Sequence, residues 1–196
     1  MLSIELALFT AVNATAATPA GIVTAARWLS QGFPILAGLL VAAGLAFGSP
    51  RLRQALMLSL VAVVVAWCAA RGVRAWVPMP RPGQLGLGVQ WIEHGVRAGF
   101  PSMHATGAFA LAQGLALGLH RRRHAPWQWL AFGLAAAVAW SRVCLGVHFP
   151  ADVLAGALTG CASALFARAL LRHALSWRGR SSAYWFRPAR PSARRT

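Results

Sequence analysis

The chain contains no lysine, and only three of its 196 residues are acidic. Charged residues make up 11% of the sequence and hydrophobic residues 58%, whereas a soluble domain usually carries about a quarter charged residues. This shortage of charge argues against an ordinary soluble domain and predicts an integral membrane protein.

All 19 basic residues are arginines, and the formal net charge is +16. A charge of this size can indicate a nucleic-acid partner. The arginines, however, lie between apolar runs and in the C-terminal tail, and they do not form one hydrophilic face. This pattern is usual for the cytoplasmic ends of membrane helices. We therefore expect membrane lipids as neighbours and no nucleic acid as a partner.

Cysteine and targeting signals are also scarce. The three cysteines, Cys68, Cys144 and Cys161, show no CxxC spacing, which argues against a disulfide framework and against a zinc site. The first ten residues contain Glu5 and no arginine. Because no basic region precedes the first apolar stretch, we expect no cleaved signal peptide.

Long apolar runs are what the sequence does contain, and a membrane helix needs about 20 mostly apolar residues. Five segments qualify: 33–48, 54–70, 104–119, 127–144 and 151–171. The third and fifth are rich in glycine and alanine. Small residues let membrane helices approach closely, so these two segments are expected to form the interior of the bundle.

The remaining segments complete a predicted all-α fold, a polytopic membrane bundle of five to six transmembrane helices. Residues 2–30 are moderately apolar and interrupted by polar residues, which predicts one or two interfacial helices or part of a sixth span. We expect residues 1–172 to form the membrane-embedded domain, with residues 1–30 interfacial or partly spanning. Residues 173–196 form a predicted basic cytoplasmic tail.

Arginine placement predicts the orientation. Arg51 and Arg53, the run 121–123 and the tail all fall on one side of a five-span bundle. By the positive-inside rule that side is cytoplasmic. Segments 71–103 and 143–150 are then extracytoplasmic, and they hold or adjoin three arginines, two histidines, one serine and one aspartate: Arg74, Arg81, Arg142, His104, His148, Ser102 and Asp152.

The spacing within this group favours chemistry on a phosphate. Asp152 follows His148 by four residues. At the start of a helix the two lie on one face, so Asp152 can reach the imidazole ring and fix its tautomer. Three arginines in one pocket require an anion, and guanidinium groups match phosphate oxygens. Ser102 and a helix N-terminus add donors. One histidine can then attack phosphorus while the other protonates the leaving oxygen.

A metal site is the alternative use of the same residues. His104, His148 and Asp152 form a possible zinc ligand set. Three adjacent arginines would oppose a dication, so we predict no metal and no cofactor.

These motifs resemble the signature of the type 2 phosphatidic acid phosphatase superfamily, which also includes vanadium haloperoxidases. That signature is lysine, six residues and Arg-Pro; then Pro-Ser-Gly-His; then Ser-Arg, five residues, His, three residues and Asp. The corresponding segments begin here at Arg74, Pro101 and Ser141. The third motif matches at every specified position. The resemblance implies the helical core of that superfamily for this chain.

The resemblance also implies roles. His148 resembles the nucleophile that forms a phosphohistidine, Asp152 its partner, and His104 the acid for the leaving group and later the base for water. The implied phosphate ligands are four side chains and the backbone N–H of Met103: Arg74, Arg81, Ser102, Arg142 and Met103. No metal is implied.

Two positions depart from the signature. Arg74 stands where the family has lysine, which preserves the charge but not automatically the geometry. Met103 stands where the family has glycine, and a side chain there would be strained if the position required a positive φ. An active enzyme is nevertheless expected.

The N-terminal stretch and the segment LGVHFPADVLAGALTG resemble small bacterial undecaprenyl-diphosphate phosphatases. This resemblance implies hydrolysis of undecaprenyl diphosphate at a multi-pass protein of the bacterial inner membrane, with the active site on the periplasmic side. The alternatives are a phosphatidic acid or phosphatidylglycerophosphate phosphatase, a lipid phosphotransferase, or a catalytically silent lipid-binding or transport protein. The expected partners are the lipid phosphate substrate and membrane lipids.

Overall fold

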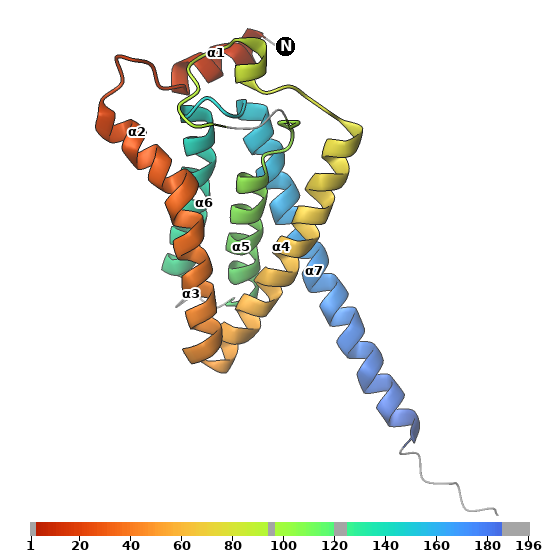
Figure 1. The fold of residues 1–196 in the computed structure, drawn as a ribbon. Helices are drawn as coiled ribbons and strands as arrows, with labels where there is room; N and C mark the ends of the chain where they lie inside the picture. The colour runs from red at the N-terminus through yellow and green to blue at the C-terminus, as the bar shows by residue number, and fades with distance from the viewer. Residues whose placement is uncertain (1–2, 94–96, 120–124, 186–196) are drawn as a thin grey trace, which may run out of the picture.

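The computed structural model describes residues 3–93, 97–119 and 125–185, and the described chain is all-helical, as predicted (Figure 1). The helices are given in chain order: α1 Ser3–Val12, α2 Ala20–Arg27, α3 Phe33–Phe47, α4 Pro50–Trp76, α5 Met103–Gly118, α6 Ala125–Cys144 and α7 Pro150–Trp185. A π-helical turn, Trp28–Gly32, joins α2 to α3, and a 3₁₀ turn, Pro82–Leu85, lies in the loop after α4.

Three helices are long and apolar enough to cross a membrane: Ala20–Phe47, Pro50–Trp76 and Pro150–Ala174. The shorter α5 and α6 run beside them in the bundle (Figure 1). Each of the five apolar segments found in the sequence overlaps one of α3 to α7. The protein is therefore a multi-pass membrane bundle, while the count of five to six spans stays a prediction.

The N-terminal region divides into two parts. Residues 20–47 form one continuous helix, because the π-helical turn links α2 to α3 without a break. The short α1 lies across the end of the bundle at which α6 finishes and α7 starts (Figure 1). Phe9 anchors α1 there, fully buried, with its ring 5.3 Å from that of Phe149.

Small residues bring α5 and α7 together, which confirms the predicted interior. A Cβ atom at Gly160 would lie 2.4 Å from the carbonyl oxygen of Thr106, and one at Gly156 would lie 2.7 Å from that of Ser102. On the other side of α5, Gly114 meets Ser59 of α4 at a similarly short distance, 2.6 Å. Side chains at these positions would push the helices apart, so glycine sets the spacing.

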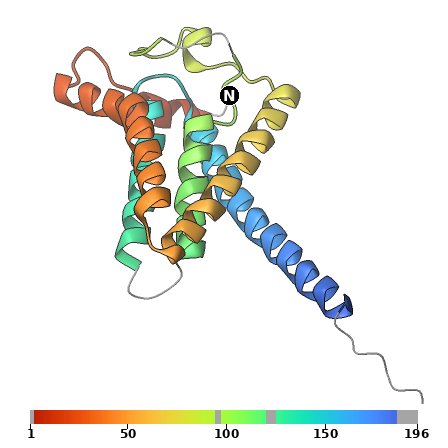
Figure 2. The ribbon, with the colours of Figure 1, turned by 60° about the horizontal axis from the view of Figure 1, so that its bottom comes forward.

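Four helix ends meet at one end of the bundle: the last turns of α4 and α6 and the first turns of α5 and α7 (Figures 1 and 2). The loop after α4 lies over this end.

Arg51 and Arg53, in the first turn of α4, lie at the opposite end of that helix from Arg74. The arginine run 121–123 lies outside the described residues. Helix α7 continues to Trp185, so the expected start of the tail at residue 173 falls within a helix.

Asn13 ties this end of the bundle together. Its amide nitrogen donates to the carbonyl oxygens of Val89 (3.0 Å) and Cys144 (3.1 Å), and its amide oxygen accepts the Val89 N–H (2.7 Å). The indole N–H of Trp91 donates to the carbonyl of Ala14 beside it. One buried side chain thus joins the end of α1, the loop after α4 and the end of α6.

Candidate active site

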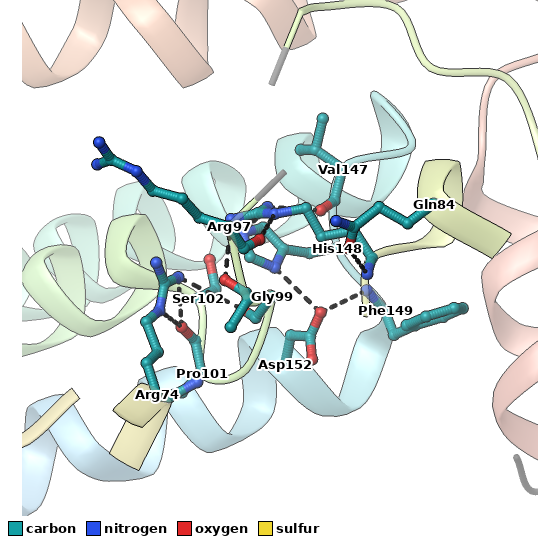
Figure 3. A network of polar contacts seen from close by, with 12 residues as sticks. Arg74, Gln84, Arg97, Gly99, Pro101, Ser102, Val147, His148, Phe149 and Asp152 are labelled. Carbon is teal, nitrogen blue, oxygen red and sulfur yellow. Dashed lines mark hydrogen bonds and ion pairs between the residues drawn. The ribbon is translucent and has the colours of Figure 1, made fainter. Parts of the chain in front are cut away.

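The centre of the site is a buried histidine paired with a carboxylate at the start of α7 (Figure 3). His148 is 1% exposed and Asp152 is 3% exposed. Oδ2 of Asp152 lies 3.0 Å from Nδ1 of His148 and accepts the N–H of Phe149 at 2.9 Å. Pro150 begins the helix, where a missing N–H costs nothing. The predicted contact between His148 and Asp152 is confirmed.

Arg81 holds the other side of the imidazole. Its Nη1 lies 3.1 Å from Nε2 of His148 and also donates to the carbonyl oxygen of Val147 at 2.9 Å. Nε donates to the carbonyl of Arg97 (2.9 Å) and Nη2 to that of Ala98 (3.3 Å). A guanidinium can only donate, so Nε2 is the acceptor and Nδ1 carries the proton toward Asp152. Both neighbours select one tautomer, in which the lone pair is on Nε2.

Arg74 reaches the site from the last turn of α4. Nε and Nη2 both donate to the carbonyl oxygen of Pro101, at 3.1 and 2.8 Å, and Nη2 also donates to that of Gly99 at 3.4 Å. The guanidinium therefore lies against the segment that leads into α5, close to Ser102 (Figure 3). In this way Arg74 joins α4 to the start of α5.

Ser102 precedes α5 and is held by its backbone. Its N–H donates to the carbonyl of Asp152 (2.9 Å), and its carbonyl accepts the N–H and the hydroxyl of Thr106. The Ser102 hydroxyl is fully buried and has no hydrogen-bond partner among the described residues. Burial of an unpaired hydroxyl is costly, which makes this group a candidate for binding a ligand atom.

Arg142, near the end of α6, is 1% exposed. Its Nη1 donates to the hydroxyl of Ser30, which is itself fully buried on the π-helical turn. Nε and Nη2 have no partner within the described part of the chain. One of the three guanidinium nitrogens is thus fixed by Ser30, and the other two are candidate donors to a ligand. A π-helical turn often occurs at a functional site.

Sequence reasoning did not identify Ser30 or Asn13 as parts of this end of the bundle. Ser30 belongs to no motif, and its contact with Arg142 crosses 112 residues of sequence. Asn13 is one of the polar residues that interrupt the moderately apolar stretch 2–30. The one available signal was the cost of placing an isolated polar side chain among apolar neighbours.

Met103 and His104 form the first turn of α5. No residue other than glycine has a positive φ among those described, so Met103 adopts an ordinary helical conformation. The strain considered for this position is absent. His104 is half-buried and lines a groove together with Arg74 and Met103. All eight residues singled out from the sequence therefore lie at the same end of the bundle.

The site carries more positive than negative charge. Arg74, Arg81 and Arg142 lie close enough for their charges to act on one another, with Asp152 as the one acid near them among the described residues. Burial and the charge of Arg74 lower the pKa of Arg81 to about 10, against the opposing effect of Asp152. Arg81 therefore stays charged at neutral pH. This balance suits a multiply charged anion.

The donor set fits phosphate better than a metal ion. Within the described residues, no three His, Cys, Asp or Glu side chains gather as a possible metal site, so the alternative ligand set of His104, His148 and Asp152 does not form. The guanidinium N–H groups can only donate, whereas metal ions require acceptor atoms.

Integral membrane phosphatases are the class to which an apolar helical bundle and a buried, arginine-held histidine point. The sequence matches the model of the PAP2 superfamily over residues 55–175, and the chain belongs to that superfamily. This match covers every site motif and supports lipid phosphatase activity in general, without a particular substrate.

Two curated proteins and one solved structure illustrate the relationship. The chain is 30% identical over 188 residues to the putative undecaprenyl-diphosphatase YbjG of Escherichia coli, covering 94% of this chain and 91% of that protein. It is 32% identical over 159 residues to the decaprenylphosphoryl-5-phosphoribose phosphatase of Mycobacterium tuberculosis, covering 80% of this chain and 84% of that protein. The crystal structure of Aquifex aeolicus LpxE superposes with a TM-score of 0.70 at 23% identity, covering 86% of this chain and 96% of that one. The last likeness shows the fold alone.

Proposed function

We propose that this protein hydrolyses undecaprenyl diphosphate to undecaprenyl phosphate and inorganic phosphate without a metal, through a phosphohistidine on His148. The observation that carries the proposal is a set of buried donors near His148, whose lone pair is on Nε2. These donors, the Ser102 hydroxyl and two nitrogens of Arg142, have no hydrogen-bond partner in the part of the chain that the structure describes. The choice of substrate is supported by the extended similarity to the Escherichia coli relative.

The first step is an in-line displacement. Nε2 of His148 gives up the hydrogen bond from Nη1 of Arg81 and attacks the terminal phosphorus, and the bond from that phosphorus to the bridging oxygen breaks. The electron pair leaves with the bridging oxygen, which takes a proton from His104. The Nδ1 proton stays on His148, where Asp152 stabilises the cation. Arg74, Arg81, Arg142, Ser102 and the Met103 N–H bind the phosphoryl oxygens and stabilise their charge.

The second step releases phosphate. His104, now neutral, takes a proton from water as the water oxygen attacks the phosphorus of the phosphohistidine. The P–N bond breaks and its electron pair returns to Nε2. Inorganic phosphate leaves, and both histidines are restored to their initial protonation states.

The proposed location is the bacterial inner membrane, with the site facing the periplasm. Arg51 and Arg53 support this orientation, because they lie at the opposite end of α4 from Arg74 and arginine-rich loops favour the cytoplasm. A lipid diphosphate exposed at the outer leaflet could then enter the site from the membrane.

Phosphate release by purified protein in detergent, with EDTA present, tests the function. The substrates are undecaprenyl diphosphate, phosphatidic acid, phosphatidylglycerophosphate and a polyprenyl-linked sugar phosphate like that named for the Mycobacterium relative. We expect the highest kcat/KM with undecaprenyl diphosphate, inhibition by vanadate, and loss of turnover in a folded His148→Ala variant. Greater activity on another lipid would replace the substrate, and dependence on added metal would refute the mechanism.

A further inference from the structure

A long apolar groove runs through the bundle from the candidate active site toward the opposite membrane face. We propose that this groove binds the hydrocarbon chain of the lipid substrate along its length, so that the enzyme prefers chains long enough to fill it. The inference rests on the proposed function, because it identifies the lipid part of a substrate whose phosphate occupies the site.

The size of the groove fits a long chain. Its volume is about 1480 Å³, whereas pockets for drug-sized ligands hold about 300–1,000 Å³. On α5 its lining extends from Met103 to Leu119, which is about 24 Å at the helical rise. The hydrocarbon core of a bilayer is about 30 Å thick. The groove therefore covers most of the depth of the apolar layer.

The groove is continuous with the phosphate site. The end of the groove nearest the candidate site is lined by Arg74, Met103 and His104. Arg74 and Met103 are expected phosphate ligands, and His104 is the expected leaving-group acid. A substrate whose phosphorus lies near Nε2 of His148 would place its leaving oxygen near His104. The attached chain then enters the groove directly.

Helix α3 forms an apolar wall of the groove. Its sequence is uncharged from Phe33 to Phe47, and none of these residues, all of them described, is buried. Leu40 of α3, Trp67 of α4 and Trp127 of α6 line the groove and are 61%, 51% and 66% exposed. Apolar side chains facing an open groove inside a bundle are suited to hydrocarbon.

Polar groups mark the far end. Ser49 and Arg51 line the groove there, at the start of α4. The apolar path thus has a defined length between one set of arginines and another. A short chain would leave its lower part to ordinary membrane lipid, whereas a long polyprenyl chain would fill it.

Glycines allow a matched test. An added Cβ at Gly107 or at Gly133 meets no atom within 4 Å. Gly107 lines the groove one turn beyond His104, while Gly133 of α6 does not line it. Ala131 also lines the groove, in the half of α6 that is farther from the candidate site. The variants are Gly107→Leu near the site, Ala131→Leu far from it, and Gly133→Leu as the control on the same helix as Ala131.

The substrates are farnesyl diphosphate, which is short, and undecaprenyl diphosphate, which is long. We expect Gly107→Leu to lower kcat/KM for both substrates about tenfold. Ala131→Leu is expected to lower kcat/KM about tenfold for undecaprenyl diphosphate alone, because only the long chain reaches it. Gly133→Leu should leave both values within about twofold of those of the unmodified protein.

Equal effects of Ala131→Leu on the two substrates, or no effect on the long one, would overturn the proposal. So would a loss in Gly133→Leu as large as that in Gly107→Leu. Failure of the proposed function is visible separately, as absence of diphosphate hydrolysis by the unmodified protein. In that case the same variants are measured with short-chain and long-chain phosphatidic acids, and the same dependence on chain length is expected.

Discussion

The hydroxyl of Ser30 accepts a hydrogen bond from Nη1 of Arg142, although the two residues are 112 positions apart in the sequence. Both side chains are buried. Ser30 lies on the π-helical turn between α2 and α3, so the first long helix of the bundle contacts a candidate phosphate ligand on α6. With Nη1 fixed by Ser30, Nε and Nη2, which have no partner among the described residues, have a defined direction, as the proposed contact with phosphate requires.

Ser30→Ala is expected to lower kcat about tenfold, because loss of one hydrogen bond to a charged group costs about 1.5–3 kcal/mol. The measurement is steady-state phosphate release over a range of substrate concentrations. Since Ser30 is expected to act through its hydrogen bond from Arg142, Ser30→Thr, which keeps the hydroxyl, should recover most of the loss.

Ser59→Ala is the matched control. Ser59 is also fully buried, but its hydroxyl donates to the carbonyl of Ala55 in its own helix. Its removal should change activity by less than about twofold. An equal loss in the two alanine variants would show that Ser30 serves only the packing of the bundle.

The sequence was sufficient to locate the main site residues because their positions depend on local geometry. Asp152 lies one helical turn after His148, and helix spacing alone predicted their contact. The sequence also predicted that the ends of α4 and α6 and the starts of α5 and α7 lie on one side of the membrane, because successive membrane spans run in opposite directions. Hydropathy likewise located the five helices from α3 to α7.

Other features depend on packing between distant segments, which has no local signal. The contact of Ser30 with Arg142 requires the π-helical turn, and the bonds of Asn13 require the loop after α4 to lie across α1. The groove beside α3 also could not be predicted, since apolar residues that face lipid, a neighbouring helix or a groove have the same sequence pattern.

Asp152→Asn is expected to lower kcat by about 10²–10⁴-fold, the range associated with losing the carboxylate that orients a catalytic histidine. An uncharged amide would accept the Nδ1 proton more weakly than the carboxylate and would not stabilise the positive charge that attack places on the ring. Steady-state turnover and mass-spectrometric detection of phosphorylated His148 during turnover would measure the effect. Unchanged phosphorylation would separate Asp152 from the chemistry.

Asn13→Ala is expected to destabilise the protein by about 1–3 kcal/mol, since the partly buried Val89 N–H loses its acceptor. Asn13→Asp should be at least as unstable, because its second oxygen would face the carbonyl oxygens of Val89 and Cys144. Thermal unfolding in detergent is the measurement. Thr10→Ala, at an exposed hydroxyl bonded within α1, is the control, and a melting temperature for Asn13→Ala equal to that of this control would refute the assignment.

Lysine substitutions should distinguish the roles of Arg81 and Arg74. Nε, Nη1 and Nη2 of Arg81 reach separate acceptors, including Nε2 of His148. A single ammonium group cannot reproduce that arrangement, so Arg81→Lys is expected to lower kcat/KM by about 10²-fold or more.

Arg74 differs because both of its short hydrogen bonds end on one carbonyl oxygen, that of Pro101. One ammonium group can replace two donors to a single acceptor and still supply a charge to phosphate, so Arg74→Lys should keep kcat/KM within about tenfold of the unmodified value. Arg74→Gln, which removes the charge, should lose much more. If Arg74→Lys were as inactive as Arg81→Lys, the planar fork at residue 74 would itself bind phosphate, and the difference from the family's usual lysine would then mark a distinct mode of substrate binding.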